Sequence, residues 1–273
     1  MKKIFYIIIL FSIFITGCED VIDIKTDTAA PQLVVDASLV WVKGTPGNQQ
    51  KIKLTMSTNY FSTVIPVVSG ASVVVRNSSN TAFDFIENQG TGEYVCSTFI
   101  PELNETYTLT VIYNGETLTA TEILRPVAPI ERVEQVLTPG IGDEEPIIEV
   151  RTFFTDPGNS TDYYLFRVQS SITAIPEFTP IEDEFFQGNE IFGLYFNVDL
   201  KVGDVLEINL YGISEQYYNY MAILFNITGN SGNPFATPPA TLRGNVVNTT
   251  HPDKYILGYF NLSEVDRRIY TVQ

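Results

Sequence analysis

Short segments with a two-residue period recur along this chain and constrain its fold more than any other feature. Every second residue of Lys51–Met56 and of Glu105–Val111 is apolar, which is typical of half-buried β-strands. Further strand-like segments are Gln32–Val42, Ala71–Arg76, Ala82–Glu87, Glu93–Thr98 and Glu116–Ile123. Seven short strands with few helical signals between them predict an all-β fold that begins with a β-sandwich.

Turn signals support this prediction. Asn114-Gly115 lies between two strand-like segments and is typical of a type I′ hairpin. The segment Pro101–Tyr107 resembles the approach to a tyrosine corner in fibronectin-like and peptidase-regulatory-like sandwiches. We therefore expect residues 31–125 to form an immunoglobulin/fibronectin-like β-sandwich.

A change of pattern follows at Arg125–Pro129. Its two prolines disfavour both a helix and a central strand, so we predict a domain boundary there. Residues 130–273 are then expected to form a second β-sandwich-like domain. Its predicted strands are Ile147–Thr155, Asp162–Ser170, Glu190–Leu200, Asp204–Tyr211, Tyr255–Asn261 and Arg267–Val272.

One helix is expected in this second domain, near residues 214–228. Ser214 suits the N-cap, Glu215 complements the helix dipole in the first turn, and Gly229 ends the pattern. An apolar stripe at 3.6-residue spacing should pack across the sheet, since a single helix on a β-domain must bury one face. The stripe consists of Tyr217, Met221, Leu224 and Phe225.

The amino terminus predicts where the protein resides. Two lysines precede the apolar run Ile4–Ile15, which is too short to span a bilayer. The small residues Thr16 and Gly17 then lead into Cys18, and this arrangement resembles a bacterial lipobox. By that resemblance, residues 1–17 are a lipoprotein signal peptide, and Cys18 carries diacylglycerol and an amide-linked acyl chain such as palmitate. Residues 18–30 form an acidic lipidated tether. The alternative is a plain secreted protein.

Acidic residues follow the cysteine directly, in the segment Glu19–Asp23. They resemble the export signal that sends Bacteroidota lipoproteins to the outer face of the outer membrane. We therefore expect a lipid-anchored outer-membrane protein that faces the cell exterior, with periplasmic retention as the alternative. Asp27-Thr28-Ala29 resembles an O-glycosylation site of the same phylum, which makes Thr28 a candidate for modification.

Charge and cysteine content exclude several functions. The formal net charge is −16, and removal of a leader containing Lys2 and Lys3 would make it −18. Such a polyanion repels nucleic acid, and we expect no nucleic-acid partner. With Cys18 lipidated, only Cys96 remains, so no internal disulfide is possible. Cys96 fits a buried strand position better than a catalytic pair with His251, the single histidine.

Motifs for catalysis are missing from the sequence. There is no nucleophile elbow, zinc-protease motif, phosphate loop or dinucleotide fingerprint, so we expect neither an enzyme nor a cofactor or metal. Two acidic triplets, Asp143–Glu145 and Glu182–Glu184, are expected to be solvated loop charge. Calcium binding by these loops and a carboxylate-dependent surface hydrolase are the alternatives.

Aromatic residues make up 12% of the chain and are frequent in its second half. Most are expected in the core, but some could stack on a sugar or peptide, because aromatics dominate binding hot spots. The candidate recognition surface consists of Phe185, Phe186, Asn233 and Phe235.

The order of several short motifs carries a family resemblance. These are Asp156-Pro157-Gly158, Tyr163-Tyr164, Asp183–Gly188, Tyr217–Tyr220, Asn233-Pro234-Phe235, Pro238-Pro239, Gly244-Asn245 and Leu257–Phe260. Together they resemble a large Bacteroidota family of surface lipoproteins of unknown function that are encoded beside TonB-dependent transporters. The resemblance implies an accessory binding protein that works with such a transporter in nutrient capture. An adhesin or structural envelope lipoprotein is the alternative.

Overall fold

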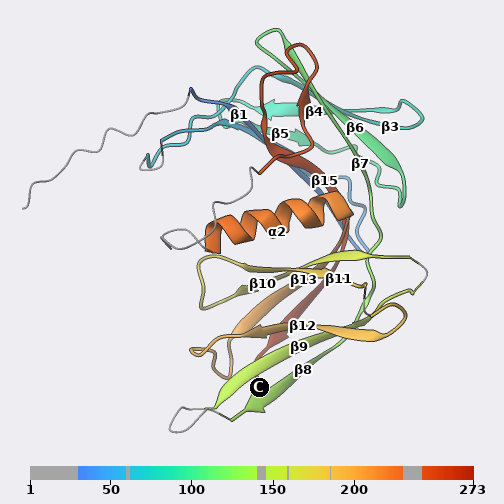
Figure 1. Cartoon of the computed structure of the whole chain (residues 1–273), viewed down its shortest axis with the longest axis vertical. Coiled ribbons are helices and arrows are strands. Elements are labelled where there is room, and N and C mark those ends of the chain that lie inside the picture. Colours follow the sequence, from blue (N-terminus) through green and yellow to red (C-terminus); the bar gives the residue numbers. More distant parts are fainter. Residues whose placement is uncertain (1–29, 60–61, 140–145, 159, 185, 230–241) are drawn as a thin grey trace, which may run out of the picture. The chain divides into compact units, whose positions relative to one another are not determined.

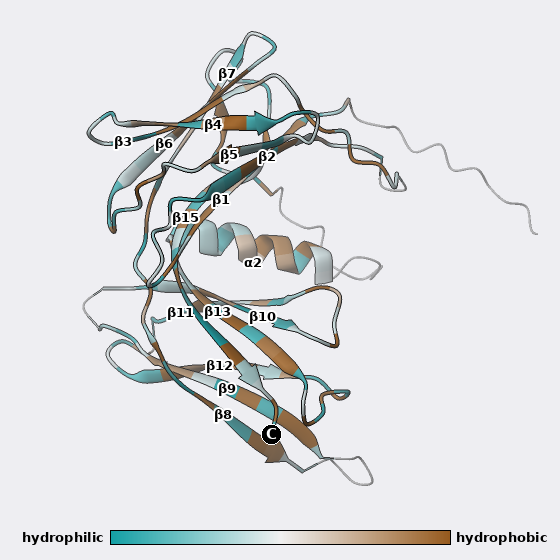
Figure 2. Cartoon of the chain, turned by 180° about the vertical axis from the view of Figure 1, so that it is seen from behind, coloured by the Kyte–Doolittle hydropathy of each residue, from teal (hydrophilic) through white to brown (hydrophobic). Residues whose placement is uncertain are grey.

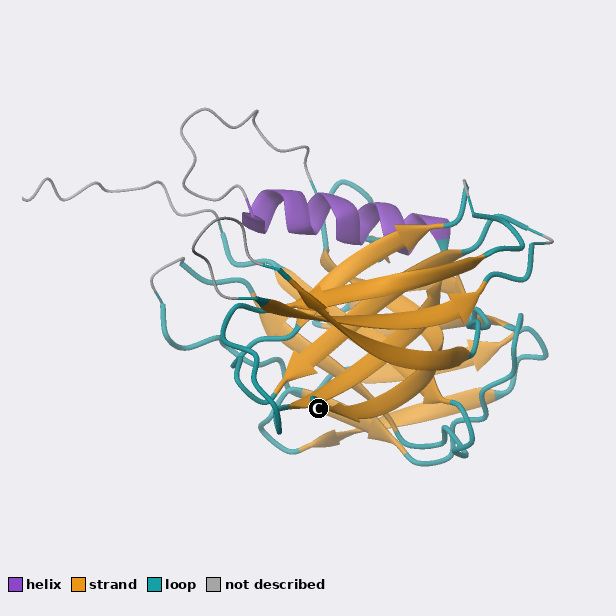
Figure 3. Ribbon diagram, turned by 90° about the horizontal axis from the view of Figure 1, so that it is seen from below, coloured by secondary structure: helices purple, strands orange, loops and turns teal. Residues whose placement is uncertain are grey.

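Strands dominate the structure of this protein. The computed structural model describes residues 30–59, 62–139, 146–158, 160–184, 186–229 and 242–273. Within these ranges it contains many strands and a single helix (Figure 3), so the predicted all-β class is confirmed. No helix in the described ranges is long and apolar enough to cross a membrane.

The first half of the chain supplies seven antiparallel strands, labelled in Figure 1 except for β2, which is labelled in Figure 2. They are β1 (Leu33–Val42), β2 (Gln50–Met56), β3 (Ser72–Asn77), β4 (Ala82–Asn88), β5 (Glu93–Cys96), β6 (Thr106–Tyr113) and β7 (Glu116–Ile123). They lie in the order β1-β2-β5-β4-β3-β6-β7. Side chains from all seven meet in one buried cluster. The sheet therefore closes over its own apolar face as the predicted β-sandwich.

The second half forms two sheets around another buried cluster. Its strands are β8 (Ile130–Thr138), β9 (Ile147–Thr155), β10 (Tyr163–Ser170), β11 (Glu177–Glu182), β12 (Glu190–Phe196), β13 (Val205–Ile213) and β15 (Leu257–Thr271). The short strand β14 (Val247–Asn248) pairs instead with β7 of the first half. One sheet has the order β12-β9-β8 and the other contains β11-β10-β13-β15. Hydrophobic and hydrophilic residues alternate along β13 (Figure 2), and Leu206, Ile208 and Leu210 are fully buried. Strands β8 and β11 were missed by the sequence analysis.

Strand β15 joins the two halves. It pairs in parallel with β1, from Val34 opposite Leu257 to Val42 opposite Val265, and antiparallel with β13 on its other side. The prediction of two separate closing strands here is wrong, because β15 runs without interruption. The interval between the two predicted strands contains Ser263, Glu264 and Asp266, polar residues of types that rarely occupy the centre of a sheet.

Those polar residues are buried and hydrogen-bonded. Glu264 accepts a hydrogen bond from the amide of Val127 at 2.9 Å, and Asp266 accepts one from the amide of Ile130 at 2.9 Å. Glu264 and Asp266 are only 6% and 4% exposed. The two carboxylates thus fix the connector between β7 and β8 against β15, which satisfies backbone donors that proline-containing segments otherwise leave unpaired.

The predicted boundary at 125–129 coincides with the change from one buried cluster to the other. The first cluster extends to Leu124 and the second begins at Val127. However, Val246, Ile256, Phe260 and Leu262 return to the first cluster, and residues Pro31–Gln273 form one compact unit. The sequence analysis did not anticipate that a carboxyl-terminal segment completes the first core. The division into two domains stays a prediction.

Two local predictions in the first half are confirmed. The buried hydroxyl of Tyr107 donates to the carbonyl of Ile100 at 2.8 Å and accepts from the amide of Glu102 at 2.9 Å, which is a tyrosine corner. Asn114 and Gly115 both have positive φ, 49° and 78°, as a type I′ turn requires. These contacts fix the loop before β6 and the register between β6 and β7.

Candidate functional site

Helix α2 (Glu215–Gly229) begins where the sequence predicts. The hydroxyl of Ser214 accepts a hydrogen bond from the amide of Tyr217 at 3.2 Å, so Ser214 is the N-cap. The same hydroxyl donates to the buried carboxylate of Glu122 at 2.8 Å. The cap therefore also fixes the start of the helix against β7.

One face of α2 packs on the sheet, as predicted. Met221 is buried in a cluster with Leu165 and Ile213. Tyr217, Leu224 and Phe225 pack against the same cluster. Ring pairs extend the contact, with Tyr163 and Tyr218 centroids 5.2 Å apart and Phe178 and Phe225 centroids 5.7 Å apart. This apolar face anchors the helix and leaves another face for other roles.

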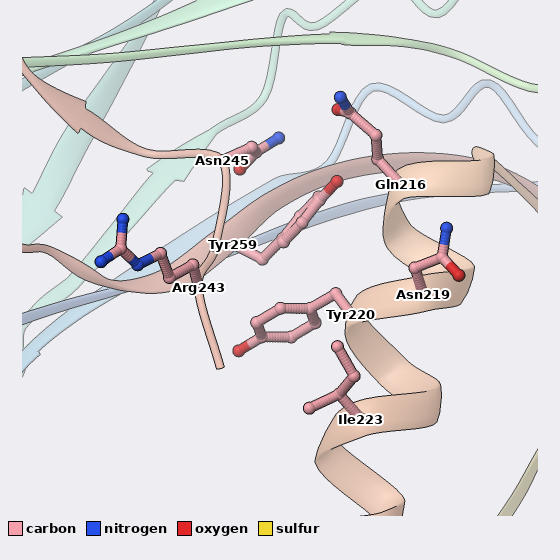
Figure 4. Close-up of a pocket in the computed structure, with 8 residues that line it drawn as sticks. Gln216, Asn219, Tyr220, Ile223, Arg243, Asn245 and Tyr259 are labelled. Atoms are coloured by element: carbon pink, nitrogen blue, oxygen red, sulfur yellow. The ribbon is translucent and has the colours of Figure 1, made fainter. Parts of the chain in front are cut away.

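A second face of α2 lines a pocket. Gln216, Asn219, Tyr220 and Ile223 occupy positions i, i+3, i+4 and i+7 of the helix, which places them in one stripe. Arg243, Gly244, Asn245 and Tyr259 line the opposite side. Figure 4 shows Gln216, Asn219 and Tyr220 on the helix, with Arg243, Asn245 and Tyr259 across from them. The pocket has a volume of about 290 Å³.

Aromatic rings and one structural amide give the pocket its form. The rings of Tyr220 and Tyr259 lie 4.8 Å apart, and Tyr217 packs 4.9 Å from Tyr259 behind them. Asn245 exchanges two hydrogen bonds of 2.8 Å with the backbone of Phe260. This wall is therefore fixed by β15, because both polar atoms of the Asn245 amide are held by its backbone.

Burial changes the chemistry of the two tyrosines. Desolvation raises the pKa of Tyr220 and of Tyr259, and the negative charge of Glu122 adds to the rise for Tyr259. Both hydroxyls therefore stay neutral at physiological pH. Arg243 is the only charged side chain among the described residues that line the pocket. Ring faces, amides and one guanidinium suit non-covalent recognition of a polar ligand.

Most of the predicted site residues lie outside the described residues. Phe186 is described and is 47% exposed, and its amide donates to the carbonyl of Asp183 at 2.6 Å. It does not line the pocket. The predicted residues outside the described ranges are Cys18, Thr28, Phe185, Asn233 and Phe235.

The pocket stripe on α2 was not among the predicted site residues. The signal was present, because amide and aromatic residues recur there at helical spacing beside the apolar stripe. What the sequence could not supply was the opposite wall, since Tyr259 and Asn245 reach the helix only through the position of β15. A stripe alone does not make a pocket.

Cys96 and His251 have separate environments. Cys96 is free and buried, with its sulfur 3.6 Å from the hydroxyl of Thr98. His251 is half exposed and lies 3.2 Å from the carboxylate of Glu116. Cys96 thus occupies the buried strand position that the sequence predicts.

The acidic triplets are not equivalent. Asp143–Glu145 lies outside the described residues. In the other triplet, Glu184 is exposed but Asp183 is fully buried. The expectation of solvated loop charge is therefore wrong for Asp183. Side chains cannot be assigned one environment from a charge run alone, because loops turn successive residues in different directions.

Comparison with known proteins gives a family but no activity. A family model described as "Domain of unknown function (DUF4249)" matches residues 19–269. No curated protein matches the chain. The match with the family model spans both buried clusters described above.

Solved structures similar to the chain include fibronectin type-III proteins. A two-domain fibronectin type-III segment from chicken tenascin is 11% identical, covering 67% of this chain and 90% of that chain, with a TM-score of 0.22. A cytokine receptor complex is 11% identical, with coverages of 66% and 83% and a TM-score of 0.25. The FN1–FN3 domains of chicken CNTN1 are 14% identical, with coverages of 68% and 62% and a TM-score of 0.26.

Proposed function

The chain belongs to the DUF4249 family, a domain of unknown function, and from this premise we propose that it is a lipid-anchored binding protein of the outer membrane. Cys18 carries the lipid, the folded part faces the cell exterior, and the pocket beside α2 captures a nutrient for a TonB-dependent transporter. It acts by binding and not by catalysis.

The leader supports the anchoring part of this proposal. An apolar run too short to span a bilayer leads through Thr16 and Gly17 to Cys18. One acyl chain holds a protein only reversibly, whereas two or more give stable attachment. A diacylglyceryl group together with an amide-linked acyl chain meets that requirement. The acidic residues after Cys18 support export of the protein to the outer face of the outer membrane.

The pocket stripe on α2 is the observation that carries the binding part. Tyr220 and Tyr259 offer aromatic surface, and Gln216 and Asn219 offer amide donors and acceptors at its rim. Such combinations bind oligosaccharides or short peptides, and Arg243 favours a ligand with a carboxylate. The described lining contains no carboxylate, histidine or cysteine, which supports binding rather than hydrolysis.

The mechanism follows from the tether. Attachment at the membrane keeps the pocket near the transporter mouth, so a released ligand meets the transporter at high effective concentration. Modest affinity is then sufficient, because the ligand must also leave. The β-sandwich of the first half serves as the spacer or docking module in this arrangement.

Lipidation is tested by substitution of Cys18. We expect the full-length protein to incorporate an alkyne analogue of palmitate and to fractionate with outer membranes. Cys18→Ser should lose both properties, while Cys96→Ser should keep both. An unlabelled wild-type protein that remains soluble after fractionation would contradict the anchor.

The binding site is tested with two aromatic variants. Panels of oligosaccharides and peptides are titrated calorimetrically against the full chain in detergent. For any compound that binds, Tyr220→Ala should weaken affinity by about 30-fold, since aromatic hot spots contribute about 2 kcal/mol. Phe186→Ala, outside the pocket, should change it little. The reverse result would place recognition on the predicted surface and overturn the pocket.

The transporter partner is tested by pull-down of intact outer-membrane complexes with the lipoprotein as bait. A TonB-dependent transporter should co-purify with wild type and be absent from the Cys18→Ser sample. Anchored protein with no transporter would favour the adhesin or structural role instead.

A further inference from the structure

Three aspartates from two loops meet at one end of the second half. Asp156 follows β9 directly, Asp162 precedes β10 directly, and Asp183 follows β11 directly. Each offers one carboxylate oxygen, and these oxygens all lie within 4.8 Å of one another. Asp156 and Asp162 belong to one loop, and Asp183 belongs to another.

Asp183 is the unusual member. It is 0% exposed, and among the described residues no donor lies within hydrogen-bonding geometry of either carboxylate oxygen. A buried carboxylate without a donor is costly, so such groups are paired or coordinate metals. Burial raises the pKa of Asp183, the nearby backbone amide of Asp162 opposes that rise, and the charges of Asp156 and Asp162 add to it.

Asp156, in contrast, is held in place by the protein. One of its oxygens accepts a hydrogen bond from the hydroxyl of Tyr164 at 2.9 Å. The other accepts from the amides of Gly158 at 2.8 Å and Gly188 at 3.1 Å. Carboxylate ligands of metals are commonly oriented by such partners. The oxygen that accepts from Tyr164 keeps a further lone pair for a cation.

Asp162 is less buried and is contacted by the hydroxyl of Ser160 at 3.3 Å. Burial and the charge of Asp156 raise its pKa, and the positive charge of Arg125 opposes that rise. One guanidinium does not balance three carboxylates. Mutual repulsion of three carboxylates whose oxygens lie within 4.8 Å of one another favours uptake of protons or of a cation by the cluster.

We propose that Asp156, Asp162 and Asp183 bind one Ca²⁺ ion, with Asp183 as the buried ligand. Every ligand atom that the described residues offer in this cluster is a carboxylate oxygen, the donor type that calcium prefers. Calcium also tolerates irregular geometry, and its remaining ligands can be water or backbone carbonyls.

The ion would connect the two sheets of the second half. The β9–β10 loop starts from the sheet β12-β9-β8, and Asp183 lies between β11 of the other sheet and β12. The loops already approach closely, because a Cβ on Gly158 would lie only 2.7 Å from the Cα of Gly188. Calcium binding should therefore appear as stabilisation of the fold.

Thermal unfolding of the full chain in detergent tests the site. After chelation, Ca²⁺ at about 100 times its Kd should raise Tm by about 5–10 °C. Asp183→Asn should lose this rise. Asp84→Asn, which changes an exposed residue of β4, should keep it. No rise in wild type, or an equal rise in Asp183→Asn, would overturn the site. Loss of the Tm rise in Asp84→Asn would also overturn the site, because the rise would then reflect general charge screening and not binding at the three aspartates.

Two further measurements keep the test decisive if Asp183→Asn does not fold. Asp162→Asn changes a less buried member and should also lose the rise. Metal analysis of the dialysed wild type should find one Ca²⁺ per chain, and none would overturn the proposal. An equal Tm rise with Mg²⁺ would overturn the assignment to calcium, because Mg²⁺ requires stricter octahedral geometry.

Discussion

The buried carboxylate of Asp266 should be essential for attachment of the connector to β15. It accepts a hydrogen bond from the amide of Ile130 at 2.9 Å and is paired with Arg268, which itself donates to the carbonyl of Ile130 at 2.8 Å. Asp266→Asn preserves the shape of this side chain but removes its charge. We therefore expect a loss of stability without a change of fold.

The magnitude follows from the donors that must be satisfied. An asparagine has one acceptor oxygen, so either the Ile130 amide or Arg268 loses its acceptor. Removal of one hydrogen bond to a charged group costs about 1.5–3 kcal/mol. For a chain of this size each kcal/mol lowers Tm by about 2–4 °C. The expected decrease in Tm is therefore about 3–12 °C.

Thermal unfolding followed by circular dichroism measures this decrease. Glu131→Gln is the matched control, because Glu131 lies in the same region but is exposed, and its Tm should change by no more than about 2 °C. Glu264→Gln, which weakens the neighbouring hydrogen bond to Val127, should behave like Asp266→Asn. If Asp266→Asn unfolds at the same temperature as Glu131→Gln, the carboxylates do not hold the connector.

Three further predictions concern stability. Tyr107→Phe removes two partly buried hydrogen bonds and should lower the free energy of unfolding by about 1–3 kcal/mol in urea titrations, whereas Tyr113→Phe should not. Burial raises the pKa of Glu122, so the folded state binds its proton more tightly than the unfolded state. This stabilisation is present below the ordinary carboxyl pKa and lost as pH rises through the raised pKa, so wild type should lose stability relative to Glu122→Gln as pH rises above the ordinary carboxyl pKa. A stability difference between wild type and Glu122→Gln that does not change with pH would contradict the raised pKa of Glu122. Gly212→Ala places a Cβ 1.8 Å from a backbone carbonyl and should lower Tm by several degrees, unlike Gly229→Ala, which meets open space.

Local features were predictable because nearby residues determine them. The N-cap at Ser214 depends on a hydroxyl three positions before the amide it accepts from. The Asn114-Gly115 turn depends on two residues that tolerate positive φ. The tyrosine corner lies within eight residues of sequence. Alternation of polar and apolar residues then fixed which side of each strand is buried.

Features that combine distant segments were not predictable. Glu264 and Asp266 lie between the two predicted closing strands, and only the connector, more than a hundred residues earlier, supplies the amides that allow their burial. The pocket requires Tyr259 and Asn245 to face α2, and Asp183 meets Asp162 through the pairing of β10 with β11. Local preferences act over a few residues, whereas burial of polar groups depends on which partners the fold brings close. The sequence alone therefore determined the strands, turns and helix, and the tertiary structure decided where its charges and tyrosines meet.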